Sequence, residues 1–292
     1  MASILDLVGN TPMAEIKKLN PNPGVRLFAK LEGNNPGGSV KDRPALNMIR
    51  SALERGDIKP GTKLVEATSG NTGIALAMIA GLFDLEIELV MPSSSTRERT
   101  LTMEAFGAKV TLLENIETCR DYAEEKGSRT GYFLLNQFAN PDNYLAHYTT
   151  TGPEIWKDTD STITHFVSSM GTTGTIMGTS MFLKERNPTI QIIGCQPTEE
   201  ASIPGIRRWP AAYLPKIYDP KRVDRIMDIT QQEAVEMTRK LAKAEGIFAG
   251  MSSGGAASAA LRLASELDSG TIVFIACDRG DRYLSSDLFG TP

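Results

Sequence analysis

The chain has 292 residues, of which 41% are hydrophobic and 23% charged, and its net charge is −4 at pH 7. This is the balance of a globular protein, and it lacks the basic surplus that nucleic-acid-binding proteins usually carry. Three widely spaced cysteines (Cys119, Cys195 and Cys277) and the absence of any apolar stretch of about 18 residues predict a cytoplasmic protein without disulfides, signal peptide or membrane span.

Short apolar, β-branched runs alternate with longer helical patterns along the chain. The runs predict strands at residues 25–31, 63–67, 86–91, 109–113, 132–135, 164–168, 190–195, 225–229 and 271–276. The longer patterns predict helices that include residues 43–55, 72–82, 96–106, 231–244 and 256–267. The helix at 231–244 is well marked, because Thr230 and Glu233 can form a capping box and Gly246 follows its end.

The alternation predicts an α/β protein with parallel sheets and helices on both faces. No flexible linker divides the chain, and we place a boundary after the fifth strand. This gives an N-terminal α/β domain over residues 1–144 and a C-terminal α/β domain over residues 145–292. Open α/β sheets bind ligands at the carboxyl ends of their strands, so we expect the functional residues in strand-to-helix loops.

The first such loop, GNNPGGSVK, covers residues 33–41 and places Lys41 in the first turn of a predicted helix. Gly37 and Gly38 provide a turn, and Ser39 can cap the helix. The positive end of the helix dipole and partial burial would both lower the pKa of a lysine here. Such a lysine is nucleophilic and can form a Schiff base. A solvated lysine at a helix start is the simpler interpretation of this motif alone.

A second loop, EATSGNTG at residues 66–73, follows one predicted strand and opens a helix. Its small polar residues would stand at a helix N-terminus, where backbone N–H groups and hydroxyls suit a carboxylate or a phosphate. These residues are Thr68, Ser69, Asn71 and Thr72. The same residues could simply cap the helix.

Two later loops have a similar composition. In SSMGTTGTIMGTS, at residues 168–180, Gly171 and Gly174 would let the backbone approach a ligand. Hydroxyls would come from Thr172, Thr173 and Thr175, so the segment is a phosphate cup by mechanism, with a plain tight turn as the alternative. In FAGMSSGGAASAA, at residues 248–260, Ser252 and Ser253 precede an alanine-rich helix, and an N-cap accounts for one of the two hydroxyls.

The histidines argue against several hydrolytic mechanisms. His147 and His165 are the only two, and neither stands in an H-E-x-x-H zinc motif. His165 lies in an apolar strand and His147 in a helical pattern with aromatic neighbours, so both are interpreted as packing residues. A G-x-S-x-G nucleophile motif is also absent.

The loops occur in the order found in one enzyme family. The sequence resembles the fold-type II pyridoxal-phosphate enzymes, which are tryptophan synthase β-like, and within them the cysteine synthases (O-acetylserine sulfhydrylases). The motifs GSVKDR, TSGNTG and GTTGT carry this resemblance together, and it extends from GNTP at residues 9–12 to GDRYLSS at residues 280–286. It implies two open twisted sheets with helices on both faces, pyridoxal 5'-phosphate as cofactor, and a homodimer.

The resemblance also implies a role for each matched residue. Lys41 would form the Schiff base with the cofactor, Asn71 would bond its 3-hydroxyl, and Ser252 would face its pyridine nitrogen. The phosphate would be held by Gly171, Thr172, Thr173, Gly174 and Thr175. The α-carboxylate of the substrate would be bound by Thr68, Ser69, Thr72 and Gln137.

The implied reaction is a β-replacement that makes L-cysteine from O-acetyl-L-serine and sulfide, with Lys41 as the general base. SIPGIRRWP, at residues 202–210, resembles the B type of cysteine synthase, which also accepts thiosulfate. Arg207 and Arg208 would lie at the mouth of the site, and we favour Arg208 as the residue that binds the incoming nucleophile. Alone, both arginines could be solvated surface residues.

Three alternatives remain open from the sequence. The same cofactor could serve a serine or threonine dehydratase or a cystathionine β-synthase. A catalytically silent binding partner is a different class, although the retention of Lys41, Asn71 and the complete GTTGT segment counts against it. The leaving group could be acetate or phosphate.

Overall fold

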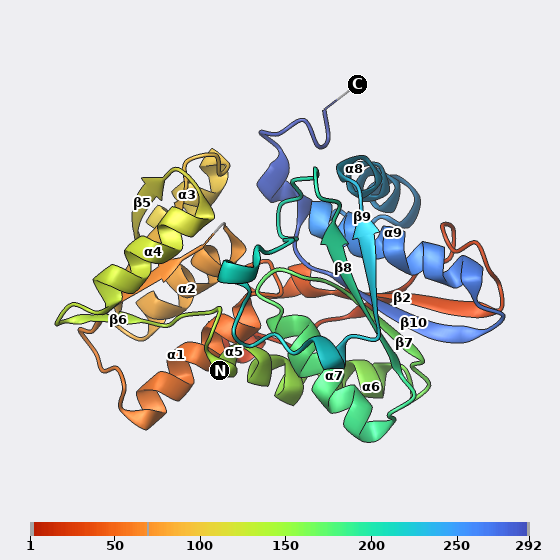
Figure 1. Cartoon of the computed structure of the whole chain (residues 1–292), viewed down its shortest axis with the longest axis horizontal. Coiled ribbons are helices and arrows are strands. Elements are labelled where there is room, and N and C mark those ends of the chain that lie inside the picture. The colour runs from red at the N-terminus through yellow and green to blue at the C-terminus, as the bar shows by residue number, and fades with distance from the viewer. Residues whose placement is uncertain (1–2, 69, 291–292) are drawn as a thin grey trace.

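A computed structural model describes residues 3–68 and 70–290 and shows two sheets, each covered by helices (Figure 1). The strands are β1 (Met13–Glu15), β2 (Val25–Leu31), β3 (Lys63–Ala67), β4 (Glu86–Pro92), β5 (Lys109–Leu113), β6 (Tyr132–Leu134), β7 (His165–Ser169), β8 (Gln191–Pro197), β9 (Arg225–Ile229) and β10 (Gly270–Ala276). The α-helices are α1 (Asp42–Arg55), α2 (Asn71–Leu82), α3 (Arg97–Ala105), α4 (Ile116–Gly127), α5 (Pro141–Ala146), α6 (Gly152–Asp158), α7 (Gly174–Arg186), α8 (Gln231–Lys240) and α9 (Met251–Glu266).

The six-stranded sheet has the order β1-β2-β10-β7-β8-β9, and the four-stranded sheet has the order β5-β4-β3-β6. Only the β1–β2 pairing is antiparallel among the described strand pairs. The predicted α/β class with parallel sheets is therefore confirmed. The nine predicted strands all form, with bounds shifted by at most a residue or two.

The division of the chain at residue 144 does not separate the two sheets. β2 pairs in parallel with β10, with Val25 opposite Gly270 and Leu31 opposite Ala276. The first two strands therefore belong to the sheet that is built mostly from the second half of the chain. Apolar alternation identifies a strand but not its partner, because pairing depends on contacts between segments far apart in the sequence.

Helices cover both faces of each sheet. In the large sheet α8 and α9 lie on one face and α6 and α7 on the other (Figure 1). In the small sheet α4 packs on one face, while α1 and α2 pack on the other. α2 is buried on all sides from Thr72 to Ala80, as expected for a helix without a polar face.

Several helices depart from the predicted pattern. α9 begins at Met251, before the predicted start at residue 256, because the MSSGG segment is helical despite its two weakly helix-forming glycines. The predicted helix at 231–244 consists of α8 and a π-helical turn at Leu241–Glu245. Its capping box and the left-handed Gly246 after its end are confirmed.

A buried ion network fixes the first turn of α1 to the large sheet. The Arg43 guanidinium donates to Glu32 at 2.7 Å and to Glu154 at 2.6 Å. Glu154, in α6, also pairs with Lys30 of β2 at 2.9 Å. Charges buried this deeply are tolerated when each is paired. Because Lys41 lies two residues before Arg43, the network also fixes the position of the Lys41 backbone.

Candidate active site

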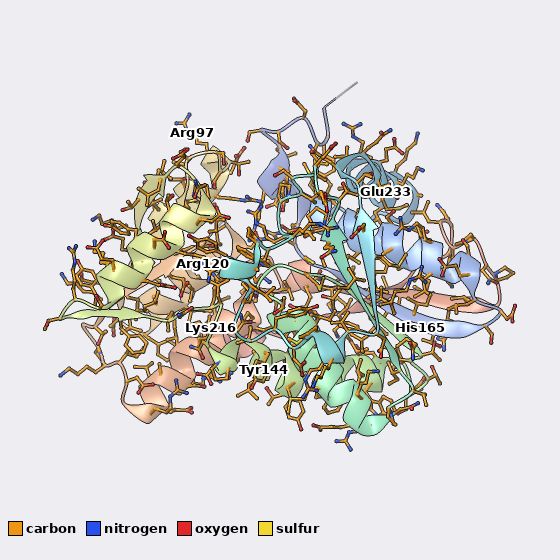
Figure 2. All side chains as sticks on the ribbon, in the orientation of Figure 1. Arg97, Arg120, Tyr144, His165, Lys216 and Glu233 are labelled. Carbon is orange, nitrogen blue, oxygen red and sulfur yellow. The ribbon has the colours of Figure 1, made fainter. Side chains whose placement is uncertain are left out.

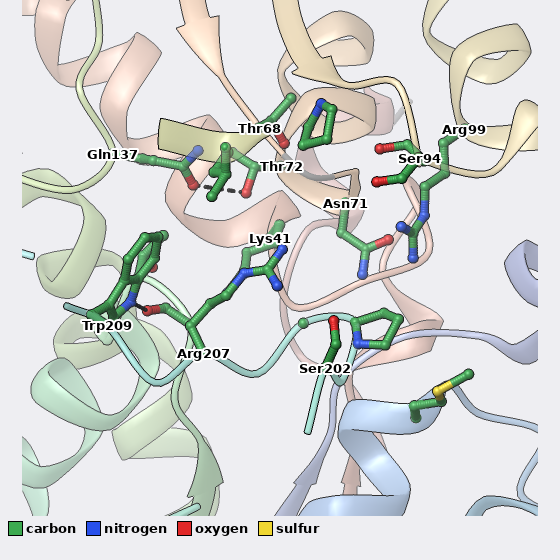
Figure 3. A pocket seen from close by; sticks show the side chains of 18 of the residues that line it. Lys41, Thr68, Asn71, Thr72, Ser94, Arg99, Gln137, Ser202, Arg207 and Trp209 are labelled. Atoms are coloured by element: carbon green, nitrogen blue, oxygen red, sulfur yellow. Dashed lines mark hydrogen bonds between the residues drawn. The ribbon is translucent and has the colours of Figure 1, made fainter. Parts of the chain in front are cut away.

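A cavity of about 380 Å³ opens at the carboxyl ends of strands from both sheets (Figure 3). Its lining comes from the segments that follow β2 to β10, as the parallel topology predicts, and from Met251 at the start of α9. Eight of the sequence-predicted residues line it: Lys41, Thr68, Asn71, Thr72, Gln137, Gly171, Thr172 and Arg207. Its cationic side chains are Lys41, Arg99 and Arg207, and no carboxylate is among its described lining residues. The cavity therefore suits anionic ligands.

Lys41 is the N-cap of α1, and its amine reaches the cavity. Burial lowers the pKa of Lys41, while the nearby Asp278 and Glu32 carboxylates oppose this shift. Among the described residues none forms an ion pair or hydrogen bond with its Nζ. Asp42, the first residue of α1, places a carboxyl at the positive end of the helix and accepts a hydrogen bond from the Gly37 N–H. As the N-cap, Lys41 makes no side-chain capping hydrogen bond, and a buried amine with a lowered pKa has the properties that a nucleophilic lysine needs.

The loop after β3 combines helix capping with buried hydroxyls that line the cavity. Thr68 Oγ1 accepts hydrogen bonds from the N–H groups of Gly70 and Gly73, each at 3.1 Å, so its own proton is left to donate. Thr72 Oγ1 donates to Gln137 Oε1 at 2.9 Å, as Figure 3 shows. Ser69, which the sequence assigned to the same carboxylate site, lies outside the described residues.

The loop after β7 forms a cup at the N-terminus of α7. Thr173 is the N-cap in a left-handed conformation, with φ of 71°, and its buried Oγ1 has no protein partner among the described residues. Thr175 Oγ1 lies 3.2 Å from His147 Nε2, and burial lowers the pKa of His147 well below its usual value. An unpaired buried hydroxyl and the free N–H groups of a first helical turn are the features of an anion site.

The two serines of α9 differ in their contacts. Gly250, not a serine, is the N-cap of this helix. Ser253 Oγ accepts the N–H of Cys277 at 2.8 Å, and Ser252 is buried beneath Gly205, which lines the cavity. The capping explanation for one serine is therefore wrong, and the Ser252 hydroxyl lies next to Gly205 of the cavity lining.

Comparison with known proteins identifies the family. The model of the family described as pyridoxal-phosphate dependent enzyme matches residues 4–278. The chain belongs to this family. It is 57% identical over 290 residues to cysteine synthase B of Pseudomonas aeruginosa, covering 98% of this chain and 97% of the relative. It is 53% identical over 293 residues to cysteine synthase B of Escherichia coli, with 99% and 97% covered.

A solved relative has the same fold. The cysteine synthase from Entamoeba histolytica matches with a TM-score of 0.93 and 38% identity, covering 100% of this chain and 91% of that one. The chain is thus a pyridoxal-phosphate dependent enzyme of the cysteine synthase type, as its motifs indicated. The residues present fit pyridoxal phosphate, because the unpaired Lys41 amine would form the imine and the unpaired Thr173 hydroxyl, in the cup next to Thr172 of the cavity lining, would donate to the phosphate.

The cysteine synthase cavity contains Arg207 and excludes Arg208. Arg207 points into the cavity (Figure 3), and burial lowers the pKa of its guanidinium. Arg208 turns outward, where its Nε donates to the Pro197 carbonyl at 2.9 Å and its Nη2 pairs with Asp228 at 2.7 Å. The structure therefore corrects the sequence analysis, which favoured Arg208. Adjacent side chains of an extended segment point in opposite directions, and only packing shows which one faces inward.

Trp209 holds the Arg207 loop close to the cup. Its indole N–H donates to the Gly171 carbonyl at 2.7 Å, and its ring meets Phe138 edge-on at 5.5 Å between ring centroids.

His165, in contrast, is the partly exposed first residue of β7 (labelled in Figure 2), whereas the cavity lies at the carboxyl end of that strand. His165 therefore takes no part in the site.

Sequence reasoning missed the partners of Asn71. Its amide contacts Asp278 and Arg282, which lie after β10. The motif CDRGDRYLSS contains both residues, but a loop after the last strand carries no pattern that shows which chain segment it meets.

Gly174→Val tests the cup. A Cβ at Gly174 would lie 1.9 Å from Asn143 Oδ1, so the substitution pushes Asn143 away and distorts the first turn of α7. We expect weaker binding of pyridoxal phosphate by equilibrium dialysis and a loss of about 1–3 kcal/mol in the free energy of unfolding. Gly81→Val in α2 is the control, because the added Cβ comes no closer than 3.5 Å to another atom. Unchanged affinity for Gly174→Val would mean that the phosphate binds elsewhere.

Glu66, a buried carboxyl in β3, makes stability depend on pH. Burial raises the pKa of Glu66 to about 8, although the backbone N–H groups of Gln137 and Asn136 oppose this. The folded chain keeps a proton that the unfolded chain, with a pKa of 4.5, releases. The contribution to the free energy of unfolding is thus full below pH 4.5 and lost as the pH rises through about 8.

Glu66→Gln removes this titration. Relative to the unmodified protein, its free energy of unfolding should rise by at least about 1 kcal/mol between pH values of about 5 and about 8, measured by urea unfolding. Glu86→Gln, at the exposed start of β4, is the matched control and should show no such trend. A difference for Glu66→Gln that does not vary with pH would contradict the assignment.

Proposed function

We propose that this protein makes L-cysteine from O-acetyl-L-serine and sulfide, and that it also accepts thiosulfate to give S-sulfocysteine. The observation that supports this most strongly is the unpaired Lys41 amine in a cavity with cationic but no acidic described lining residues. The substrate carboxylate, the cofactor phosphate and both nucleophiles are anions, so one cavity of this charge can bind all of them.

Bound pyridoxal phosphate supplies the electron sink that makes the α-proton of an amino acid acidic. Lys41 would hold the cofactor and, as a free amine, remove the proton from the substrate Cα. Burial favours this role, because a lowered pKa leaves more of the amine unprotonated near neutral pH. Asn71 and Ser252 would contact the cofactor ring, and the cup at residues 171–175 its phosphate.

The loop after β3 would orient the amino acid. Thr68 has its hydroxyl proton available, and the first turn of α2 presents backbone N–H groups to the cavity. A substrate carboxylate there would accept several hydrogen bonds at once. Gln137 would join them through the second hydrogen of its Nε2, whose first donates to the Ala67 carbonyl at 2.6 Å, and Thr72 would turn its hydroxyl proton from Gln137 Oε1 to the substrate.

Arg207 would bind the nucleophile. Thiosulfate is a dianion with a bulky sulfonate end, and a guanidinium offers two parallel donors to its oxygens. Sulfide is small and needs less guidance. Trp209 and Phe138 flank this side of the cavity and would exclude water that could compete with the nucleophile.

Product analysis tests the reaction. The purified protein is incubated with O-acetyl-L-serine and either sulfide or thiosulfate, and the products are identified by mass. Cysteine and S-sulfocysteine, each formed with one acetate released, are the expected products. O-phospho-L-serine is run in parallel to identify the leaving group. Pyruvate from L-serine without any nucleophile would favour the dehydratase alternative.

The assembly and location are further parts of the proposal. We propose a homodimer in the cytoplasm. The three cysteines are free and buried, which is consistent with a reducing compartment. In the described part of the chain no helix is long and apolar enough to cross a bilayer. Light scattering of the purified protein measures the mass of the assembly.

A further inference from the structure

The carboxylate of Asp278 joins three chain segments that are distant in sequence. Asp278 follows β10 and is 2% exposed. Its Oδ2 accepts hydrogen bonds from Asn71 Nδ2 and from the Tyr283 hydroxyl, both at 2.7 Å. Its Oδ1 accepts the Gly250 N–H at 3.2 Å. One carboxylate therefore ties the start of α2, the start of α9 and the 3-10 helix η7 (Gly280–Tyr283) together.

The Asn71 amide is held at both ends. Its Oδ1 accepts a hydrogen bond from Arg282 Nη1 at 2.5 Å, while Nδ2 donates to Asp278. An amide nitrogen carries two hydrogens, and the second has no protein partner among the described residues. Because rotation of the amide would break both charged contacts, this second N–H keeps one direction in the cavity that Asn71 lines.

Gly250 lets the same carboxylate approach α9. A Cβ at Gly250 would lie 2.4 Å from Asp278 Oδ1 and 2.4 Å from Tyr283 Cε2. Gly250 is the N-cap of α9, and Ser252 stands in the first turn of that helix. The placement of Ser252 and the direction of the Asn71 amide thus depend on one buried charge.

We propose that Asp278 is a positioning residue for the cofactor ring, acting through Asn71 and through the first turn of α9. This inference rests on the proposed contacts of Asn71 and Ser252 with pyridoxal phosphate. It does not depend on which nucleophile the enzyme uses. The buried negative charge also balances Arg282, whose other guanidinium nitrogen donates to the Gly37 carbonyl in the turn before Lys41.

The test is the dissociation constant of pyridoxal phosphate, measured by absorbance titration of the cofactor-free protein. Asp278→Asn keeps the side-chain size but replaces one acceptor oxygen with a donor, so one of the three donors loses its partner. We expect cofactor binding to weaken about 10- to 100-fold and the visible absorption of the bound cofactor to shift. Asp281→Asn, an exposed aspartate in η7, is the matched control and should bind within about twofold of the unmodified protein.

A double-variant cycle separates positioning from general structural support. Asn71→Ala alone should weaken binding. If Asp278 acts through Asn71, adding Asp278→Asn to Asn71→Ala should cost less than Asp278→Asn does alone. A purely structural role would give the full loss in both backgrounds, together with a matching drop in the unfolding temperature of the cofactor-free protein.

Each outcome decides the inference. The proposal would be overturned if Asp278→Asn bound pyridoxal phosphate with the same affinity and spectrum as the unmodified protein. Additive losses of affinity in the double-variant cycle would also overturn it. Unmodified affinity in Asn71→Ala would instead disprove the proposed Asn71 contact and, with it, the basis of the inference. Should Asp278→Asn fail to fold, Gly250→Ala displaces the same carboxylate without removing its charge and should also weaken binding; unchanged affinity there would overturn the proposal.

Discussion

Replacing Lys41 with alanine is expected to lower the rate of cysteine formation by about 100- to 10,000-fold, because the variant lacks the group proposed to remove the α-proton. The cavity offers no substitute at this place, since its other described cationic side chains are arginines, which do not give up a proton. The rate is measured as cysteine formed from O-acetyl-L-serine and sulfide.

Chemical labelling tests the covalent role of Lys41 separately from the rate. Borohydride should fix pyridoxal phosphate to Lys41 in the unmodified protein and to no residue in Lys41→Ala, as read from peptide masses. The variant should still bind the cofactor reversibly, because the cup at the start of α7 is intact.

The control is a second lysine variant. Lys30→Ala is not suitable for this, since Lys30 pairs with Glu154 in the buried network. Lys63→Ala, at the exposed start of β3, is suitable. Labelling at another lysine would disprove the assignment.

Arg207→Ala should lower kcat/KM for thiosulfate about 10- to 150-fold, which corresponds to the loss of one charge-assisted hydrogen bond of about 1.5–3 kcal/mol. The loss with sulfide should be much smaller, since that nucleophile presents no sulfonate oxygens. Acetate release from O-acetyl-L-serine in the first turnover should be nearly unchanged, because it precedes nucleophile binding. Stopped-flow and steady-state rates with each nucleophile provide the measurements.

Arg208→Ala is the matched control that the chain itself supplies. It removes an adjacent guanidinium of the same kind, but one that pairs with Asp228 at the surface. It should leave kcat/KM for thiosulfate within about threefold of the unmodified value, as is usual for an exposed ion pair. Equal losses with both nucleophiles in Arg207→Ala would indicate a structural role for Arg207. Full thiosulfate activity in both variants and in the double variant would show that neither arginine binds thiosulfate. No S-sulfocysteine from the unmodified protein would leave a cysteine synthase that uses sulfide alone.

The sequence by itself determined nine of the ten described strands, most of the helices and the four loops, and it missed the three-residue β1. Period-2 and period-3.6 apolar patterns are local, so they predicted β3, β5 and β9 at their observed bounds. In a parallel α/β topology the strand-to-helix loops lie at the edge of the sheet where the strands have their carboxyl ends. Lys41, Asn71 and Gly171 therefore meet in one cavity, although well over a hundred residues separate the first from the last.

Only the tertiary structure decided which neighbour faces inward and which segments meet. Arg207 and Arg208 are chemically alike, and the choice between them depends on the Pro197 carbonyl and the Asp228 carboxylate, which hold Arg208 outside the cavity. β2 pairs with β10, although the two strands stand near opposite ends of the sequence, and no local pattern encodes that pairing. The Asp278 contacts also join segments that are far apart in the sequence. Asp278 lies in a loop without a periodic pattern, so the sequence does not show which donors it meets. A buried carboxylate needs hydrogen-bond donors, and the fold supplies them from distant segments.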